Sequence, residues 1–328
     1  MKNAADLVKS YVEAGFTKIH LDASMRCADD AGDRRSALDE QTVTERAAAL
    51  AQVAEEAANG HAAGSPRPVY VIGTEVPVPG GERAEAQAPD VTKPEDVAST
   101  LGLMKTELQK RGLGGVWERI IAVVVQPGVE YSDDAVFEYG RCKTADLSAF
   151  IRTAGGCLYE AHSTDYQKPE ALSQMVEDHF AILKVGPWLT FAFREAVFAL
   201  SFIEEEWLEN RRSIELSGIR DVLERAMVED PRDWKGYYTG DEAYLRYARK
   251  YSYSDRSRYY WPKPEVQAAL SRLLKNLADN LAPLTLVSQF LPLQYEAVRA
   301  GVLSREPAAL IHDKIRGVLG VYSRACRV

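Results

Sequence analysis

The sequence predicts an α/β protein whose parallel strands form part of a TIM-type β/α barrel, followed by a helical extension. Apolar strand segments alternate with amphipathic helical segments five times before residue 188. This alternation is typical of parallel sheets with right-handed crossovers. After residue 188 only helical spacing follows. We therefore predict an incomplete barrel over residues 1–208, and a helical extension over residues 209–328 that packs on it.

The first half of the predicted barrel is delimited by turn and capping residues. A helix over residues 4–14 ends at Gly15, because glycine is favoured just past a helix C-terminus. A second helix should begin at Thr42, since Glu45 completes a capping-box spacing. The other elements expected here are the strands Thr17–Asp22, Val69–Glu75 and Arg119–Gln126, and a helix over residues 94–111. Arg119–Gln126 is almost wholly apolar, as an interior parallel strand should be.

The second half continues the alternation and then becomes helical. We expect strands at Gly155–Ala161 and Phe180–Gly186, preceded by helices over residues 144–153 and 169–179. Residues 188–208 have the spacing of one long helix. Further helical segments are expected over residues 213–228, 242–250, 264–280 and 307–324. The last third is therefore predicted to contain no strand.

The composition is that of an ordinary globular protein. The 328 residues are 46% hydrophobic and 27% charged, with a formal net charge of −8. An acidic chain is a poor partner for nucleic acids or anionic membranes, and no stretch approaches the roughly 20 apolar residues of a membrane span. The four cysteines include no C-x-x-C pair, which favours a reduced, cytoplasmic protein.

Polar side chains recur at the ends of four expected strands. They are Asp22 and Ser24, then Glu75, then Gln126, and then Glu160, His162, Ser163 and Asp165. Taken singly, each of these residues could instead be a solvated loop residue. Parallel strands of a barrel end at one rim, however, and carboxylates that converge there with a histidine suit a metal ion or a sugar. All except Glu75 and His162 are candidate substrate-site residues.

Two glycine-containing turns are candidate phosphate sites. Lys184 and Gly186 end the fifth strand and open a helix, and late barrel strands often hold phosphate at such a helix N-terminus. The alternative is that Gly186 and Pro187 simply begin the helix. Gly80 and Gly81 form a second turn whose amides could face an anion.

Other histidines and the aromatic residues receive structural interpretations. His20 stands in the middle of a strand, so we expect it in the core or facing outward and give it little functional weight. His61 falls in a loop, and His179 and His312 are expected to be solvated on helices. The aromatic stretch Tyr251–Trp261 could stack on bases, but the acidic chain favours packing between the extension and the barrel.

Several long motifs resemble the GatZ/KbaZ family, and the resemblance extends from end to end. They are Gly15–Met25, Val71–Glu82, Val124–Glu130, Tyr159–Gln167, His179–Pro187, Ser254–Pro262 and Ser288–Pro292. The family is known as the non-catalytic subunit of class II D-tagatose-1,6-bisphosphate aldolase. The resemblance implies a partner, the catalytic aldolase subunit, and a role in galactitol and N-acetylgalactosamine breakdown. It also implies a sugar phosphate as a possible ligand.

Some family members carry the label tagatose-6-phosphate kinase. The sequence contains neither G-x-x-x-x-G-K-[ST] nor G-x-G-x-x-G, so it gives no support to an ATP-dependent kinase or a nicotinamide dehydrogenase.

The resemblance also implies that part of the family's barrel precedes Met1. A closed barrel has eight strands, so about three strand–helix units are lacking. A truncated gene, a start codon assigned too late and a genuine fragment are the alternatives. We favour the late start, because an open sheet would leave its edge strands unpaired.

The distant relation to class II aldolases implies a metal, with Zn²⁺ as the candidate. There, histidines on different strands hold zinc, and His162 resembles the ligand after the seventh barrel strand. A catalytic zinc ion needs about three protein ligands. Glu75 could supply an oxygen ligand. Gly186 replaces the usual asparagine of the phosphate motif, which weakens that assignment.

Two functions remain open at this point. The chain could be an accessory subunit that stabilises a catalytic aldolase and is not catalytic alone. The alternative is a metal-dependent ketose 4-epimerase or aldolase in its own right, acting through proton transfer or retro-aldol chemistry.

Overall fold

The fold is built on an open sheet of five parallel strands. We describe residues 1–27, 30, 38–62, 64–73 and 89–328 of the computed structural model. The strands are β1 (Lys18–Asp22), β2 (Val69–Gly73), β3 (Ile120–Val125), β6 (Leu158–Ala161) and β7 (Phe180–Leu183). They pair in the order β1-β2-β3-β6-β7, and every pairing is parallel. The predicted parallel α/β class is confirmed. The described residues form no closed barrel, and the partial barrel stays a prediction.

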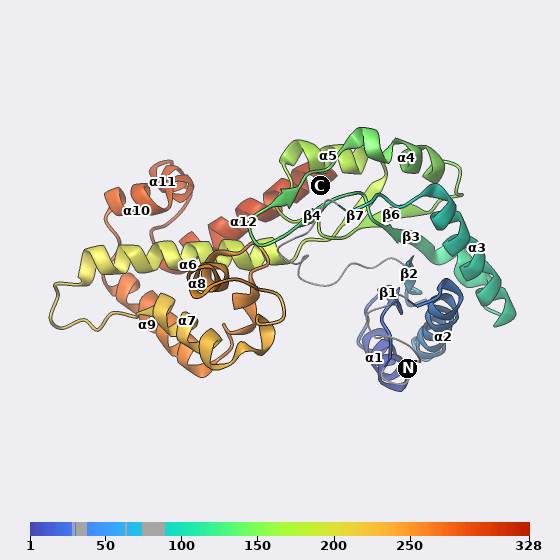
Figure 1. The fold of residues 1–328 in the computed structure, drawn as a ribbon, viewed down its shortest axis with the longest axis horizontal. Coiled ribbons are helices and arrows are strands. Elements are labelled where there is room, and N and C mark those ends of the chain that lie inside the picture. Colours follow the sequence, from blue (N-terminus) through green and yellow to red (C-terminus); the bar gives the residue numbers. More distant parts are fainter. Residues whose placement is uncertain (28–29, 31–37, 63, 74–88) are drawn as a thin grey trace.

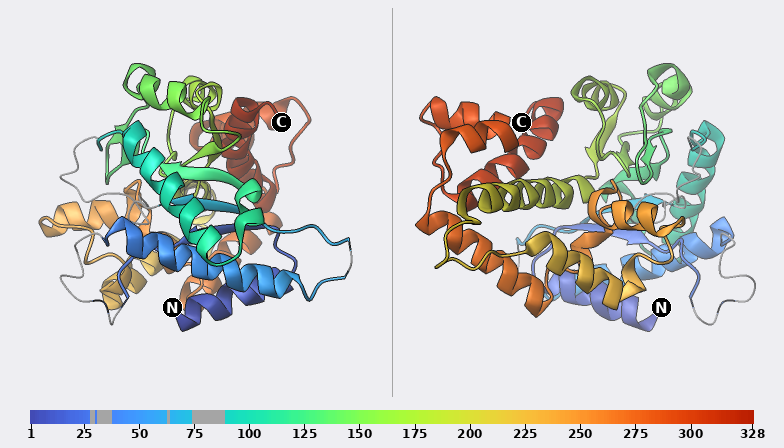
Figure 2. Two further views of the ribbon diagram at one scale, coloured as in Figure 1. Left: turned by 90° about the vertical axis from the view of Figure 1, so that its right-hand side faces the viewer. Right: turned by 60° about the vertical axis from the view of Figure 1, so that its left-hand side comes forward.

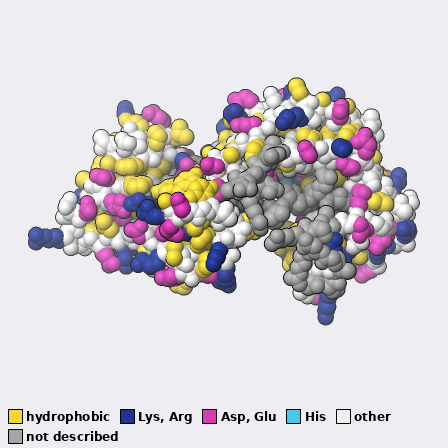
Figure 3. Space-filling view, viewed as in Figure 1, with side chains coloured by type: hydrophobic (Ala, Val, Ile, Leu, Met, Phe, Trp, Pro, Cys, Tyr) yellow, Lys and Arg dark blue, Asp and Glu magenta, His cyan; other side chains and the backbone are white. Residues whose placement is uncertain are grey.

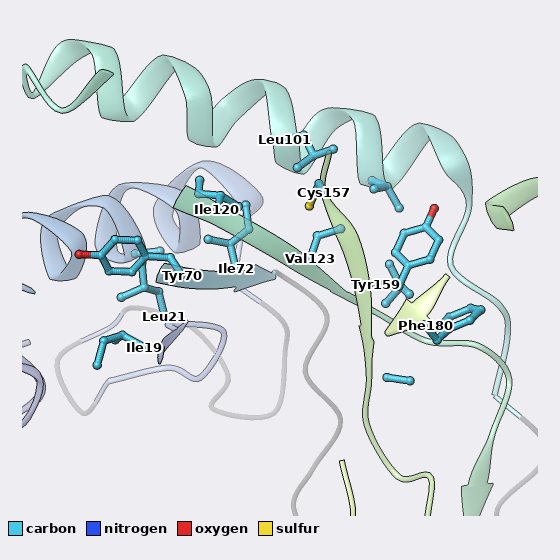
Figure 4. Packing of buried hydrophobic residues seen from close by; sticks show 14 of the residues in the cluster. Ile19, Leu21, Tyr70, Ile72, Leu101, Ile120, Val123, Cys157, Tyr159 and Phe180 are labelled. Carbon is cyan, nitrogen blue, oxygen red and sulfur yellow. The ribbon is translucent and has the colours of Figure 1, made fainter. Parts of the chain in front are cut away.

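Helices cover one face of this sheet. They are α1 (Lys2–Glu13), α2 (Glu40–Ala58), α3 (Pro94–Lys110), α4 (Ala145–Ile151) and α5 (Pro169–Glu177). Figure 4 shows part of the core between the layers, including Ile19, Leu21, Tyr70, Ile72, Val123 and Tyr159. These side chains alternate along their strands with residues of the opposite face, as the two-residue period of a strand requires. The helix-covered face is therefore hydrophobic, and the opposite face is free to carry other chemistry.

The described chain is helical after β7, as predicted. It contains α6 (Pro187–Leu208), α7 (Ile219–Glu229), α8 (Glu242–Tyr251), α9 (Pro264–Asp279), α10 (Leu284–Phe290), α11 (Pro292–Arg299) and α12 (Pro307–Cys326). Figure 1 shows α6 running from the sheet into the helical part, with α12 returning beside it. A second hydrophobic core lies between these helices. Because α6 contributes to both cores, it joins the two parts of the molecule.

Several local predictions need correction. Thr42 is not the N-cap of α2: the helix begins at Glu40, and the side chain of Asp39 accepts the Thr42 amide. A hairpin of β4 (Glu130–Tyr131) and β5 (Val136–Phe137) was not expected. Helices α10 and α11 were also missed. The remaining short elements are 3-10 helices at Gly114–Arg119, Arg141–Thr144, Pro231–Asp233 and Arg256–Tyr259.

The packing of α2 and α3 across the sheet is seen in Figure 2, left, in blue and teal. A carboxylate of α2 fixes this layer to the strands. Arg119 donates from Nη1 and Nη2 to the two oxygens of Glu55 at 2.7 and 2.6 Å, and the Tyr70 hydroxyl donates to the same carboxylate. Burial would by itself raise the Glu55 pKa, but these bonds lower it below its ordinary value.

Glu55→Gln should destabilise the protein by about 1–2 kcal/mol at neutral pH. Because the folded-state pKa of Glu55 is lowered, its contribution is present above the ordinary pKa and is lost as the pH falls through the folded-state pKa. Urea unfolding of the wild type and the variant should therefore show a smaller difference at acidic pH than at pH 7. The exposed neighbour Glu56 is the control, since Glu56→Gln should change little. A difference independent of pH would contradict the prediction.

Gly73 ends β2 where the sheet leaves no room for a side chain. A Cβ atom there would lie 2.7 Å from Val124 Cβ. We expect Gly73→Ala to lower the free energy of unfolding by about 1–3 kcal/mol, because overpacking displaces β3. Gly102, within α3, has open space around it, so Gly102→Ala should stabilise by up to about 1 kcal/mol. If Gly73→Ala and Gly102→Ala changed the free energy of unfolding in urea equally, the steric explanation would be excluded.

Candidate functional site

A buried carboxylate gathers four basic side chains on the face of the sheet that none of the described helices α1 to α5 covers, which we call the uncovered face. Glu160, on β6, has a fully buried side chain. Its Oε1 lies 2.9 Å from His162 Nε2, 3.3 Å from His20 Nδ1 and 3.2 Å from Lys184 Nζ. Its Oε2 accepts from Lys18 Nζ at 3.0 Å. We call these five residues the Glu160 cluster.

Strand geometry explains how the cluster forms. Lys18 and His20 alternate with the buried Ile19 and Leu21 along β1, so they project from the opposite face. Two strands lie between β1 and β6, a separation of roughly 14 Å in a flat sheet. His20 and Glu160 can span this gap only because the sheet curls toward its uncovered face. On the two intervening strands, Val71, Ala122 and Val124 form a small buried cluster on this face.

The electrostatics of the cluster follow from burial and charge. Burial alone would raise the Glu160 pKa, but the His162 hydrogen bond and the Lys184 charge outweigh it and lower the pKa to about 2. Burial lowers the pKa of His20 to about 4, although the Glu160 charge acts in the other direction. At neutral pH the Glu160 carboxyl is therefore ionised and the His20 imidazole is uncharged.

Three residues of the cluster were candidate site residues in the sequence, and two were not. Glu160, His162 and Lys184 were all singled out from the sequence, and the fold brings them together. His20 was expected in the core or facing outward and was given little functional weight; the fold places its Nδ1 3.3 Å from Glu160 Oε1. Lys18 was missed. The signal for both was the period-two pattern of Lys18, His20 and Asp22, which marks one face of β1.

Other predicted substrate-site residues hold local turns. The Ser24 amide and hydroxyl donate to Asp22 Oδ1 at 3.0 and 2.7 Å. Gln126 Oε1 accepts the amides of Gly128 and Val129. Each arrangement stabilises the chain as it leaves a strand. The roles of Asp22, Ser24 and Gln126 in substrate binding stay predictions.

The turn after β6 is also internally bonded. The Ser163 hydroxyl donates to Glu130 Oε2 at 3.1 Å. Asp165 Oδ1 accepts the amides of Gly186 and Trp188 at 2.9 and 2.8 Å. A phosphate bound at the Gly186 amide would have to replace this carboxylate. Glu75, Gly80 and Gly81 lie outside the described residues.

Three members of the cluster have the donor chemistry of a metal site. His20, Glu160 and His162 offer two imidazole nitrogens and a carboxylate oxygen, all within 4.8 Å of one another. This donor set suits Zn²⁺. Within the described part of the chain, no second group of this kind occurs.

The aromatic stretch after α8 packs between the helices and the sheet end, as predicted. The Tyr253 and Tyr166 ring centroids are 4.5 Å apart, and the Tyr166 hydroxyl donates to the Tyr253 carbonyl. The Tyr253 amide in turn donates to the Asp133 carbonyl, next to β4. These rings are occupied by protein contacts rather than presented for stacking on bases.

Charged side chains of both signs are spread over the described residues of the viewed face. Figure 3 shows acidic and basic side chains interspersed there, without a large field of either sign. Among the described helices, none combines the length and apolar character needed to cross a bilayer.

Comparison with known proteins identifies a family and a solved structure that this chain resembles. The family model described as "D-tagatose-1,6-bisphosphate aldolase subunit GatZ/KbaZ-like" matches residues 1–327. Among solved structures, one described as "a probable tagatose 6 phosphate kinase from Sinorhizobium meliloti 1021" is 40% identical in sequence. It superposes with a TM-score of 0.85, over 97% of this chain and 75% of the other.

Proposed function

The chain belongs to the GatZ/KbaZ-like family of D-tagatose-1,6-bisphosphate aldolase subunits, and from this premise we propose that it is the accessory subunit of a class II aldolase. In this role it supports the activity and stability of a catalytic partner in carbohydrate breakdown. Galactitol and N-acetylgalactosamine catabolism are the pathways that the family suggests. We further propose that the curled sheet is part of a β/α barrel and that the protein works in the cytoplasm.

The observation that carries the accessory role is the state of Glu160. Its Oε2 accepts from the Lys18 ammonium at 3.0 Å, and its Oε1 forms an ion pair with the Lys184 ammonium at 3.2 Å. A metal-dependent aldolase site needs its anionic ligand available to the ion, with a further position open for the substrate. Here the basic side chains already neutralise the carboxylate. This favours a structural role, in which the cluster stabilises the uncovered face of the sheet, over a catalytic role.

Co-expression tests the accessory role. The chain is produced with and without a class II tagatose-bisphosphate aldolase catalytic subunit, and that subunit is also produced alone. We expect co-purification, higher aldolase activity and a longer half-life at elevated temperature than for the catalytic subunit alone. His20→Gln should leave these gains in place, because the accessory role assigns no chemistry to the imidazole. The absence of both co-purification and any gain would refute the proposal.

A second candidate function is supported by His20. With it, the cluster offers two imidazoles instead of the single histidine expected from sequence. The chain alone, supplied with a divalent metal, would then interconvert or cleave a phosphorylated ketose by metal-assisted proton transfer. Assays of tagatose–fructose epimerisation and of bisphosphate cleavage test this. Activity that survived His162→Ala unchanged would show that the cluster is not the site.

Phosphoryl transfer is not proposed. The name printed for the Sinorhizobium meliloti structure belongs to that protein, and this sequence contains no G-x-x-x-x-G-K-[ST] string to cradle ATP phosphates.

A further inference from the structure

The Glu160 cluster has the form of a cation site that is filled by a lysine. Three groups approach the same carboxylate oxygen: the two imidazole nitrogens and the Lys184 ammonium. An ammonium group is itself a compact cation. The position that an inorganic cation would occupy beside Glu160 Oε1 is therefore shared with Lys184.

The spacing of two ligand pairs matches that of an ion site. Glu160 Oε1 lies 2.9 Å from one imidazole nitrogen and 3.3 Å from the other. Bonds of about 2.0–2.1 Å from zinc to nitrogen and oxygen place neighbouring ligands roughly 2.9–3.4 Å apart. All three ligand atoms lie within 4.8 Å of one another, so an ion bound at Glu160 Oε1 could be reached by both imidazoles.

The second ring nitrogen of His20 is not one of the expected ligands. The Nε2 atom is buried and has no hydrogen-bond partner among the described residues. The ring atom close to Glu160 Oε1 is Nδ1, so an ion bound there would leave the ring proton on Nε2. The case for a cation site therefore rests on the arrangement of Nδ1, the His162 imidazole and Glu160 Oε1.

The two lysines differ in what they would do when a cation enters. Lys184 bonds the oxygen shared with both histidines, whereas Lys18 bonds the other oxygen. The Lys184 side chain is 41% exposed, so its ammonium group can leave Glu160 and be solvated by water. Lys18 can stay in place and continue to orient the carboxylate.

We propose that His20, Glu160 and His162 bind one divalent cation of the zinc type, and that the Lys184 ammonium closes this site until the cation displaces it. This inference goes beyond the accessory role, which needs no metal, and it concerns the isolated chain. Failure of co-expression would leave it standing, and failure to bind metal would leave the accessory role standing.

The test is a calorimetric titration of the isolated, metal-free protein with Zn²⁺. We expect one ion per chain. Lys184→Met should tighten binding by about tenfold or more, because it removes the competing charge. Lys168→Met is the matched control, since its ammonium pairs with Glu138 elsewhere, and it should leave the affinity unchanged. The expected effect of Lys184→Met is tighter Zn²⁺ binding, which a misfolded variant cannot mimic.

Ligand identity is tested by loss of binding. His20→Gln and Glu160→Gln should each weaken binding at least tenfold, whereas His179→Gln should not, because His179 contacts Arg152 away from the cluster. Circular dichroism establishes that each variant is folded. Co²⁺ in place of Zn²⁺ should give a visible spectrum of nitrogen and oxygen ligands, without the thiolate bands that Cys27 or Cys142 would produce. Binding that was unaffected by both His20→Gln and Lys184→Met, or no binding by any form, would overturn the proposal.

Discussion

Replacing Asp255 by alanine is expected to lower the free energy of unfolding by about 3–5 kcal/mol, the largest effect that we predict for a single substitution. The Asp255 side chain is fully buried and accepts from Arg194 Nε at 2.8 Å and from the Ser257 hydroxyl at 2.9 Å. The Thr190 hydroxyl donates to the other carboxylate oxygen. Arg194, on α6, is itself 2% exposed. Without Asp255, its charge would be buried with no counter-ion.

The expected loss arises mainly from the partner left behind. Arg194 lies over the Phe191 ring at 4.2 Å, in a place where a guanidinium cannot reach water without disturbing the joint between α6 and the loop after α8. Removing one member of a buried pair costs more than the pair contributes over an apolar substitute. The Asp255→Ala, Arg194→Met double variant should therefore lose less than the sum of the two single variants.

Urea unfolding followed by circular dichroism measures these differences. Asp255→Asn is the informative control. Asp255 has a φ of +44°, a left-handed conformation that asparagine also tolerates, and the amide oxygen still accepts hydrogen bonds. We expect Asp255→Asn to cost clearly less than Asp255→Ala. If Asp255→Ala lost less than about 1 kcal/mol, the pair would not be the main connection here.

The elements that the sequence predicted well are those with local signals. Apolar runs such as Ile120–Val125 and the proline and glycine residues between them located all five strands of the sheet. Helix α6 was predicted almost to the residue, because Pro187 marks its first turn and its apolar spacing persists to Leu208. The short helices α10 and α11 were missed, since seven and eight residues provide too few periods to stand out.

The candidate site was predicted only where it is local in sequence. Glu160 and His162 lie two residues apart, so any fold that ends a strand there brings them together. His20 and Lys18 join them from more than 130 residues away, and only through the curl of a sheet with two strands between. Sequence periodicity gives the face of β1 on which His20 lies, but not how far the sheet bends. That bend is set by packing across the whole layer.

Polar residues at strand ends cannot be divided into ligands and turn residues from their positions alone. Gln126 and Asp165 share the placement of Glu160, yet their oxygens accept backbone amides of the next segment. Such bonds satisfy main-chain donors that a bend leaves free. The distinction depends on which atoms lie within reach, and that is a property of the folded chain.

Asp165 allows the clearest separation of the two roles, and Asp165→Ala is expected to cost about 2–4 kcal/mol. Its carboxylate binds the Gly186 and Trp188 amides at the start of α6, and the residue is 2% exposed. Loss of the acceptor would leave two part-buried donors without this partner at the start of the helix that joins both cores. Each such donor costs about 1–3 kcal/mol.

Asp165→Asn should cost less than about 1 kcal/mol, because the amide oxygen can still accept both bonds. Burial raises the pKa of Asp165, although the two amides act in the opposite direction. A raised folded-state pKa means that this carboxyl loses its stabilising contribution as the pH rises through that value. A neutral asparagine escapes that loss at pH 7, so the substitution removes little.

Thermal and urea unfolding of the two variants then decide whether Asp165 anchors the start of α6 or binds a substrate. An anchor gives a large loss for alanine and a small one for asparagine, with stimulation of the catalytic subunit preserved in Asp165→Asn. A substrate carboxylate gives the opposite pattern, since asparagine would abolish a charge-dependent contact while the fold remained stable. The bonds that Asp165 makes to α6 lead us to expect the first pattern, which would move this residue from the candidate substrate site to the framework that supports the Glu160 cluster.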